Sequence, residues 1–454
     1  MRKPLLYFVS IATGCALSWS AQAMTVDVTQ AVEMALEADP RIGEQRYLAQ
    51  KSQAFLQEVE GHGGWRVDLN AFAAFATQVE GDLFKSGSCE SGACRSRDDK
   101  YDYEGLTPWL SLTVALIKPL YTFGKLENYK DAASANTLIQ DAEVRLRQGQ
   151  TVMDAKRAYY GYLTARDGER LLKDVKKRLD GATDLVKTWL EEESGDVKQA
   201  DLFALEAANG LLINRQAEMK ATRQIALDGL KVITGVGLAG ELNVADRGIR
   251  PVAVPEGTLE ELQARALELR PEMAQVEAGL RGRRALVKAK KAERMPNVYF
   301  GVAGLANYTE GRDRLKNPYI SDPFNDYAAT PLLGLRWTFQ KGVLDARVAQ
   351  EQAELDALVE KSSLARQGIP YQVAEQYYKV HHGYEGVKGM EQASRSARRW
   401  MVSEYADFQA GVAKADKVMI AFQGYVLAHA DYLKSVYNYN MSVAKLMQVI
   451  GESK

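Results

Sequence analysis

Hydrophobic and polar residues alternate in four short stretches of the chain, two in each half. In the first of them Trp65, Val67 and Leu69 alternate with Arg66 and Asp68. A period of two over about ten residues predicts a strand, and about ten residues is the length that a membrane-spanning strand needs. The segments between the paired strands, 80–104 and 310–329, contain many Gly, Ser, Asp and Asn residues and predict exposed loops. The four predicted strands are about 65–79, 106–123, 297–309 and 330–340.

Most of the remaining chain has the period of a helix. One long stretch has apolar residues spaced 3-4-3-4-3, which is typical of a coiled-coil seam: Leu172, Val175, Leu179, Ala182, Val186 and Trp189. We interpret this seam as packing between helices. Pro40 and Pro271 should kink or divide the helical stretches in which they lie, and Pro370 is the expected irregularity of another. The predicted helical stretches are 29–60, 124–194, 197–233, 259–293, 342–409 and 412–449.

An internal repeat accounts for this symmetry. Residues 35–42 match residues 266–273 at a spacing of 231, and five further short matches follow in the same order. The matches predict a duplicated helix-strand-strand-long-helix-helix unit. The first repeat covers 24–245, a linker covers 246–258, and the second repeat covers 259–454.

The N-terminus has the pattern of a secretory signal peptide, residues 1–23. Two cations precede an apolar run, and Ala21-Gln22-Ala23 offers a cleavage site after Ala23. Gly14-Cys15 leaves lipidation as an alternative, although Ala12 stands where lipoprotein signals prefer a larger aliphatic residue. No later segment has about 18 consecutive apolar residues, so no transmembrane helix is expected after the signal.

Two cysteines remain after the signal, Cys89 and Cys94, in a polar loop. In an oxidising compartment we expect a disulfide between them. The alternative, a zinc site, would lack ligands because only two sulfurs and no nearby histidine are present.

Composition narrows the class of protein. The 454 residues include 58 Lys and Arg against 59 Asp and Glu, a balance that argues against a nucleic-acid binder driven by bulk charge. A mean hydropathy of −0.29 argues against a polytopic helical membrane protein. Four strands with one apolar face cannot close a barrel alone. Either several chains share one barrel, or the strands form an ordinary soluble sheet.

The chain resembles the TolC family of outer membrane channel proteins. The similarity covers about residues 25–451 and rests on motifs in a fixed order. They are Ala-Leu-x-x-x-Pro at Ala35 to Pro40 and at Ala266 to Pro271, the corner Pro119-Leu120-Tyr121-Thr122-Phe123-Gly124, Gly195-x5-Asp201, and Tyr437-Asn438-Tyr439 before Val449-Ile450-Gly451.

This resemblance implies a mainly α protein with a small β part that forms a homotrimer. Each chain would give four strands to a shared twelve-stranded transmembrane β-barrel and its long helices to a periplasmic α-barrel. The trimer would be the exit duct of a tripartite efflux pump or type I secretion system. It would lie in the outer membrane with a long periplasmic extension and would dock with a periplasmic adaptor and an inner-membrane transporter.

The resemblance also assigns roles to the two turns between helices. Gly195 and Asp196 in the first turn, and Gly411 and Val412 in the second, would contact the adaptor. Asp201 occupies the place of an acidic residue at the pore constriction. In the second half Lys417 and Ile420 stand where acids are expected and Asp416 is one residue away, so this constriction departs from the family pattern. The alternative role of Asp201 and Asp416 is that of solvated residues at a helix start.

Signs of catalysis are weak, and we expect a conduit, with neither enzymatic activity nor cofactor nor metal. Gly235-Val236-Gly237-Leu238-Ala239-Gly240 matches a dinucleotide-binding fingerprint in letters, but it follows a predicted helix and is interpreted as a helix terminator. The hypothesis of a catalytic group of Ser, His and Asp stays open, although the sequence contains no G-x-S-x-G motif to support it. The main competing hypothesis is a non-conducting periplasmic coiled-coil scaffold or adaptor-like protein.

Overall fold

The computed structural model describes residues 24–79, 105–194, 196–312, 314, 319 and 321–452. The expected signal peptide, the Cys89–Cys94 pair and Gly195 lie outside these described residues. Most of the described chain is helical and a smaller part forms strands, which confirms a mainly α fold with a small β part.

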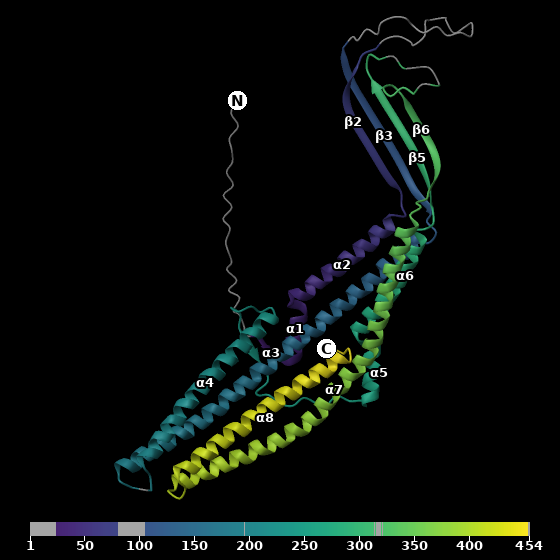
Figure 1. Cartoon of the computed structure of the whole chain (residues 1–454). Coiled ribbons are helices and arrows are strands. Elements are labelled where there is room, and N and C mark those ends of the chain that lie inside the picture. Colours follow the sequence, from purple (N-terminus) through teal and green to yellow (C-terminus); the bar gives the residue numbers. More distant parts are fainter. Residues whose placement is uncertain are drawn as a thin grey trace, which may run out of the picture. The chain divides into compact units, whose positions relative to one another are not determined.

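The order of elements is the same in both halves of the chain (Figure 1). The opening helices have 11 and 22 residues in each half, and the closing helix has 35 residues in each. The duplicated unit is therefore confirmed. The first half contains α1 (Val28–Ala38), α2 (Pro40–Gly61), β2 (Arg66–Thr77), β3 (Leu106–Tyr121), α3 (Lys125–Glu191) and α4 (Gln199–Ile233). The second half contains α5 (Leu259–Leu269), α6 (Pro271–Ala292), β5 (Asn297–Thr309), β6 (Tyr327–Arg336), α7 (Lys341–Gln409) and α8 (Ala415–Val449).

The prolines divide the opening helices instead of kinking them. Pro40 is the first residue of α2 and Pro271 the first of α6, and the residue before each has extended backbone. Proline suits the first helical position because its missing N–H has no acceptor there. Pro370 does not end its helix, and α7 continues through it. Pro370 thus lies inside a 69-residue helix, where it cannot donate a backbone hydrogen bond.

The chain folds into two compact units, and each draws on both halves of the sequence. Unit 1 contains the described residues up to 43, then 146–270 and those from 369 on. Unit 2 contains 44–145 and 271–368. The long helices α3 and α7 each contribute residues to both units. In unit 1, two three-residue strands, β1 (Met24–Val26) and β4 (Leu242–Val244), also pair in parallel.

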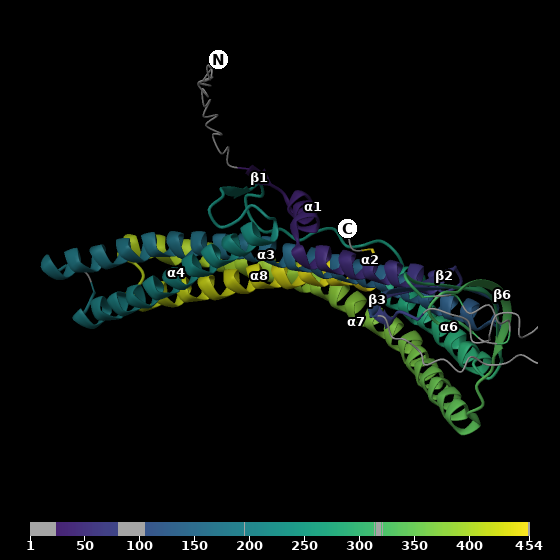
Figure 2. The same ribbon diagram turned by 90° about the horizontal axis from the view of Figure 1, so that it is seen from above.

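The seam residues form the core of unit 1. Leu172, Val175, Leu179, Ala182 and Val186 are buried, and they pack in one cluster with residues of α4, α7 and α8. The rings of Trp189 and Phe408 meet edge to face with centroids 5.2 Å apart. In Figures 1 and 2, α4 runs beside α3 and α8 beside α7. The seam is thus a contact between helices, as its spacing predicts.

Buried polar side chains hold the extended segment 246–258 against the helices of unit 1. Asn440, which is 1% exposed, donates from Nδ2 to the carbonyl of Arg250 at 2.8 Å. Its Oδ1 accepts the amide of Val252 at 3.0 Å. Asp167 accepts the amide of Ile249 at 2.8 Å, and Tyr159 donates to Asp246 at 2.7 Å. Because this segment has no sheet partner, Asn440 and Asp167 satisfy backbone groups that a sheet would satisfy elsewhere.

Unit 2 contains an antiparallel sheet in the order β2-β3-β5-β6. The β6 strand covers Tyr327–Arg336, three residues earlier at its start and four earlier at its end than the predicted 330–340. The register explains the early end. Arg336 pairs with Asn297, the first residue of β5, so Trp337 and the residues after it have no partner on that side.

Asp39, which precedes α2, makes the stability of unit 1 depend on pH. Its carboxylate is 4% exposed and accepts Arg41 Nη2 at 2.8 Å and Thr151 Oγ1 at 2.5 Å. Burial disfavours its charged form, but the hydrogen bonds from Arg41 and Thr151 outweigh burial and lower its pKa to about 2. The ionised carboxylate therefore stabilises the fold fully above pH about 4, and this contribution is lost as the pH falls through about 2.

The variant Asp39→Asn should be less stable at pH 6 by about 2 kcal/mol, because the paired carboxylate is gone. The difference from the unchanged protein should shrink as the pH approaches 2. Denaturant unfolding followed by circular dichroism at several pH values measures both. A difference that stays constant from pH 6 to pH 2 would contradict the role of the ionised carboxylate.

Candidate functional site

The sheet of unit 2 has one apolar face that is exposed in the chain. Paired residues of all four strands contribute to it, because residues opposite each other in a ladder point to the same side. Leu69 is 61% exposed and Leu333 is 73% exposed, which is unusual for large aliphatic side chains. The apolar face consists of Val67, Leu69, Ala71, Ala73, Phe75, Leu110, Leu112, Val114, Leu116, Phe300, Val302, Ala306, Tyr308, Tyr327, Leu333 and Leu335.

The opposite face of the sheet is more polar. It carries Asp68, Asn70 and Thr113 at its centre, and Ser111 Oγ donates to Asn307 Oδ1 at 2.7 Å. Aromatic residues gather where the apolar face ends near the helices. Trp65 and Phe300 lie edge to face at 6.1 Å, and Trp337 and Phe339 lie 4.3 Å apart. An apolar band bounded by aromatic rings is typical of a surface that contacts lipid.

The outer edges of the sheet are open. Among the described residues, β2 pairs with β3 alone and β6 with β5 alone. Each edge strand therefore presents a row of backbone N–H and C=O groups without a strand partner in this chain. An open edge beside an exposed apolar face needs a further strand, since neither lipid nor an apolar interface can satisfy these groups.

The two turns between long helices are joined by an ion pair that the sequence did not predict. Lys414 Nζ lies 3.3 Å from Asp196 Oδ2, and both side chains are exposed. Val412 is 80% exposed at the second turn, and Gly411 has a φ of 74°, which favours glycine. Asp196, Gly411 and Val412 are thus accessible, while Gly195 is outside the described part of the chain. The pairing of Lys414 carried no signal in the sequence, because 218 residues separate it from Asp196.

Asp201 is the third residue of α4, and its carboxylate faces the start of its own helix. Asp201 Oδ2 accepts the amide of Lys198 at 2.8 Å, as the acidic residue of a capping box does. Asp416 and Lys417 are exposed in the first turn of α8, and Asp416 accepts the adjacent amide of Lys417 at 2.9 Å. In the described chain no hydrogen bond or ion pair joins Asp201 to Asp416 or Lys417. Within one chain, Asp201 acts as a helix-capping residue.

Other sequence motifs lead to no chemical site in the described chain. No group of three or more His, Cys, Asp and Glu side chains there is placed to hold a metal ion. Gly235 and Gly237 both have positive φ and follow the end of α4, so the dinucleotide-like motif is a turn. Among the helices that the structure describes, none is long and apolar enough to cross a membrane.

Comparison with known families agrees with this geometry. Residues 262–452 match the family model described as outer membrane efflux protein. This part of the chain is therefore similar to the outer membrane efflux protein family. The match confirms the family resemblance and the outer membrane localisation. No curated protein sequence matches the chain.

Solved structures of outer membrane channels share the fold. The Campylobacter jejuni CmeC outer membrane channel superimposes with a TM-score of 0.75 at 13% identity, covering 99% of this chain and 94% of its own. The open state of the Neisseria gonorrhoeae MtrE outer membrane channel superimposes with a TM-score of 0.73 at 15% identity, covering 94% of this chain and 89% of its own. The outer membrane protein VceC from Vibrio cholerae superimposes with a TM-score of 0.72 at 13% identity, covering 93% of this chain and 96% of its own. At these identities the similarity shows the fold.

Replacing Asp201 with Ala should weaken the first turn of α4 by about 1 kcal/mol, because the amide of Lys198 loses its acceptor. Asp416→Ala is the matched control, since Asp416 only accepts the amide of the next residue and its loss should matter less. Hydrogen exchange of the backbone amides at residues 198–202 measures the change. Equal protection in Asp201→Ala and in the unchanged protein would exclude the capping role.

Proposed function

We propose that the protein is the exit duct of a tripartite efflux pump or type I secretion system. It conducts substrate passively from the periplasm or the transporter to the outside, and the inner-membrane partner supplies the energy. The observation that carries this proposal is the sheet of unit 2, with its exposed apolar face and two open edges. The family match to outer membrane efflux proteins supports it.

The open edges favour an assembly of several chains. Transmembrane barrels of a single chain begin at about eight strands, and this chain contributes four to its sheet. When β2 of one copy pairs with β6 of the next, every edge group finds a partner. Three copies then form a closed barrel of twelve strands with the apolar faces outward. The homotrimer of the TolC family has this arrangement, and the long helices would continue it as the periplasmic α-barrel.

The helix turns are the proposed contacts with the periplasmic adaptor. Gly195, Asp196, Gly411 and Val412 fit this role, and the exposure of the last three supports it.

We place the pore constriction at Asp201, Asp416 and Lys417. Threefold symmetry would bring like charges together there, and their repulsion is relieved by opening or by a bound counter-ion. The capping bond of Asp201 leaves its second carboxylate oxygen for such a role. The Cys89–Cys94 disulfide stays a prediction.

A non-conducting periplasmic scaffold or adaptor-like protein is the competing proposal. Its strands would form a soluble sheet, and its apolar face would need a cover. Extraction separates the two: a detergent-dependent, heat-sensitive trimer in the outer membrane supports the channel. A monomer in the soluble periplasmic fraction would contradict it.

Replacing Leu112 with Arg should reduce the amount of trimer in the outer membrane, because Leu112 is central on the apolar face. An arginine facing lipid at mid-depth costs about 2–4 kcal/mol per strand. Thr113→Arg is the matched control, because its side chain points to the polar face. Heat-modifiable migration of membrane extracts measures the trimer. Equal loss in both variants would mean that the apolar face does not contact lipid.

Conductance in a planar bilayer tests the conduit and its constriction. The purified trimer should conduct, and the double variant Asp201→Ala/Asp416→Ala should show a higher or less cation-sensitive closed-state conductance, because the repelling charges are removed. Unchanged closed-state conductance would count against the gating role of these aspartates. The complete absence of channels from the unchanged protein would count against the conduit itself.

A further inference from the structure

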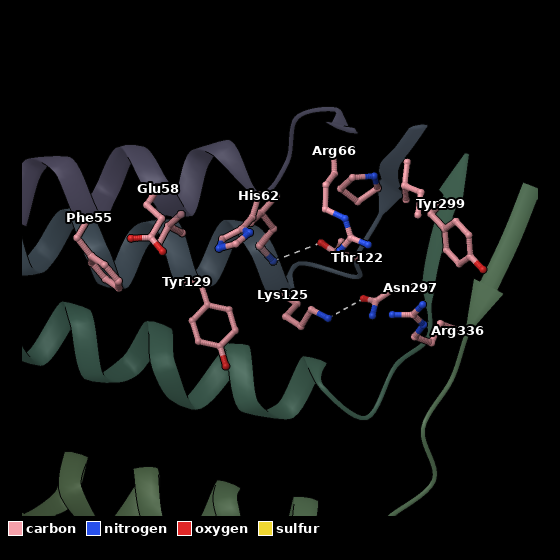
Figure 3. A pocket seen from close by; sticks show the side chains of 14 residues that line it. Phe55, Glu58, His62, Arg66, Thr122, Lys125, Tyr129, Asn297, Tyr299 and Arg336 are labelled. Carbon is pink, nitrogen blue, oxygen red and sulfur yellow. Dashed lines mark hydrogen bonds between the residues drawn. The ribbon is translucent and has the colours of Figure 1, made fainter. Parts of the chain in front are cut away.

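A cavity of about 510 Å³ lies within unit 2 where the strands meet the helices (Figure 3). Its walls come from both repeats: α2, β2, β3 and α3 from the first, and β5 and β6 from the second. Its residues on the strands include Arg66, Ile117 and Arg336, which share the face of the sheet opposite the apolar one. The residues that line it are Phe55, Glu58, Val59, His62, Arg66, Ile117, Pro119, Thr122, Lys125, Leu126, Tyr129, Asn297, Tyr299 and Arg336.

Three cations line the part of this cavity nearest the sheet. Figure 3 shows Arg66, Lys125 and Arg336 there, with Glu58 toward the opposite end on α2. Arg66 is neutralised by Asp68, with Nη2 and Oδ2 2.8 Å apart. Among the described residues, no carboxylate lies within ion-pair distance of Lys125 or Arg336. The cavity therefore has two cations that no described carboxylate neutralises by contact.

The hydrogen-bond partner of Lys125 and the ring beside Arg336 are neutral. Lys125 Nζ donates to the side-chain oxygen of Asn297 at 2.7 Å. The guanidinium of Arg336 lies 6.0 Å from the ring centre of Tyr299. Burial lowers the pKa of Lys125, and the charge of Glu293 opposes this only in part. A half-buried ammonium with an amide as its partner is incompletely compensated, and an added anion would supply the missing charge.

The rest of the cavity suits an apolar body. Phe55 and Val59 of α2 line it, as do Leu126 and Tyr129 of α3. Glu58 lies at this end and would repel a second negative charge. The cavity thus combines a cationic end near the sheet with an apolar part that also contains Glu58, and His62 lies between Glu58 and the cations. This volume fits a small ligand that is buried in a mostly apolar pocket and oriented by a few polar groups.

We propose that this cavity binds a small organic monoanion with an apolar or aromatic body, such as an aromatic carboxylate or sulfonate, through Arg336 and Lys125. The inference rests on the proposed function for its setting. In a closed barrel, the face that carries Arg66 and Arg336 turns inward, so three such cavities would line the conduit where it changes from helices to strands. Each would hold a passing organic anion before it leaves through the barrel.

Three probes test the proposal by calorimetric titration of the purified protein in detergent, with detergent alone as the blank. Naphthalene-2-sulfonate carries the anion and the aromatic body, naphthalene-2-sulfonamide lacks the charge, and inorganic sulfate lacks the body. The sulfonate should bind at least tenfold more tightly than either of the others. If sulfate binds as tightly as the sulfonate, the ligand need not be organic and the proposed ligand class is wrong. If the sulfonamide binds as tightly as the sulfonate, the cations do not contribute to binding.

Variants locate the binding. Arg336→Gln and Lys125→Gln should each weaken sulfonate binding about tenfold or more and leave the weak sulfonamide binding unchanged. Arg366→Gln is the control, since Arg366 is an exposed residue of α7 outside the cavity. Equal sulfonate affinity in Arg336→Gln and in the control would refute the site. Arg336 forms no hydrogen bond among the described residues, so this variant keeps the test open if Lys125→Gln misfolds.

Conductance keeps this inference separate from the function on which it rests. Arg336→Gln should conduct like the unchanged protein in potassium chloride but lose block by naphthalene-2-sulfonate. If the protein conducts but the sulfonate neither binds nor blocks it, the anion site is refuted and the proposed duct is not. If the protein binds the sulfonate through Arg336 but never conducts, the proposed duct is refuted and the anion site is supported.

Discussion

The need to pair every backbone hydrogen-bonding group at the edges of one sheet constrains this protein most strongly. A sheet of four strands with an apolar face and two open edges is unstable in either solvent. Water would contact its apolar face, and lipid would leave the backbone groups at its edges unpaired. In the proposed assembly, further copies of the same sheet would pair the open edges and lipid would cover the apolar face. Each repeat contributes two adjacent strands to this sheet, and the pairing of β3 with β5 joins the two repeats.

Close helix packing in unit 1 depends on small residues opposite aromatic ones. A Cβ at Gly181 would lie 2.7 Å from the hydroxyl of Tyr405, and one at Gly424 would lie 2.8 Å from the ring of Trp400. Both glycines let an aromatic side chain of α7 approach a neighbouring helix. Such packing leaves little room for substitution. The same unit is linked to the extended segment 246–258 by Asn440, so helices and linker are one packed body.

Sequence patterns predicted the elements well where local physics decides them. Alternation located the strands, and the 3-4 spacing located the helix seam, because both patterns depend on neighbours along the chain. The start and end of β6 were missed, since Asn297, on another strand, determines where its pairing ends. Asp201 was assigned to a constriction by family resemblance. The structure shows a capping bond that the positions of Lys198 and Asp201, three residues apart, already allowed.

The sequence by itself determined the duplicated unit, the two-faced strands and the resemblance to outer membrane channels, because repeats and periodicities are written along the chain. Only the tertiary structure decided which distant residues meet. Lys414 reaches Asp196, Asn440 binds the backbone at residues 250 and 252, and Arg66, Lys125 and Arg336 line one cavity. These contacts follow from sheet register and helix packing, which join residues that are far apart in the chain and leave no mark in the local pattern.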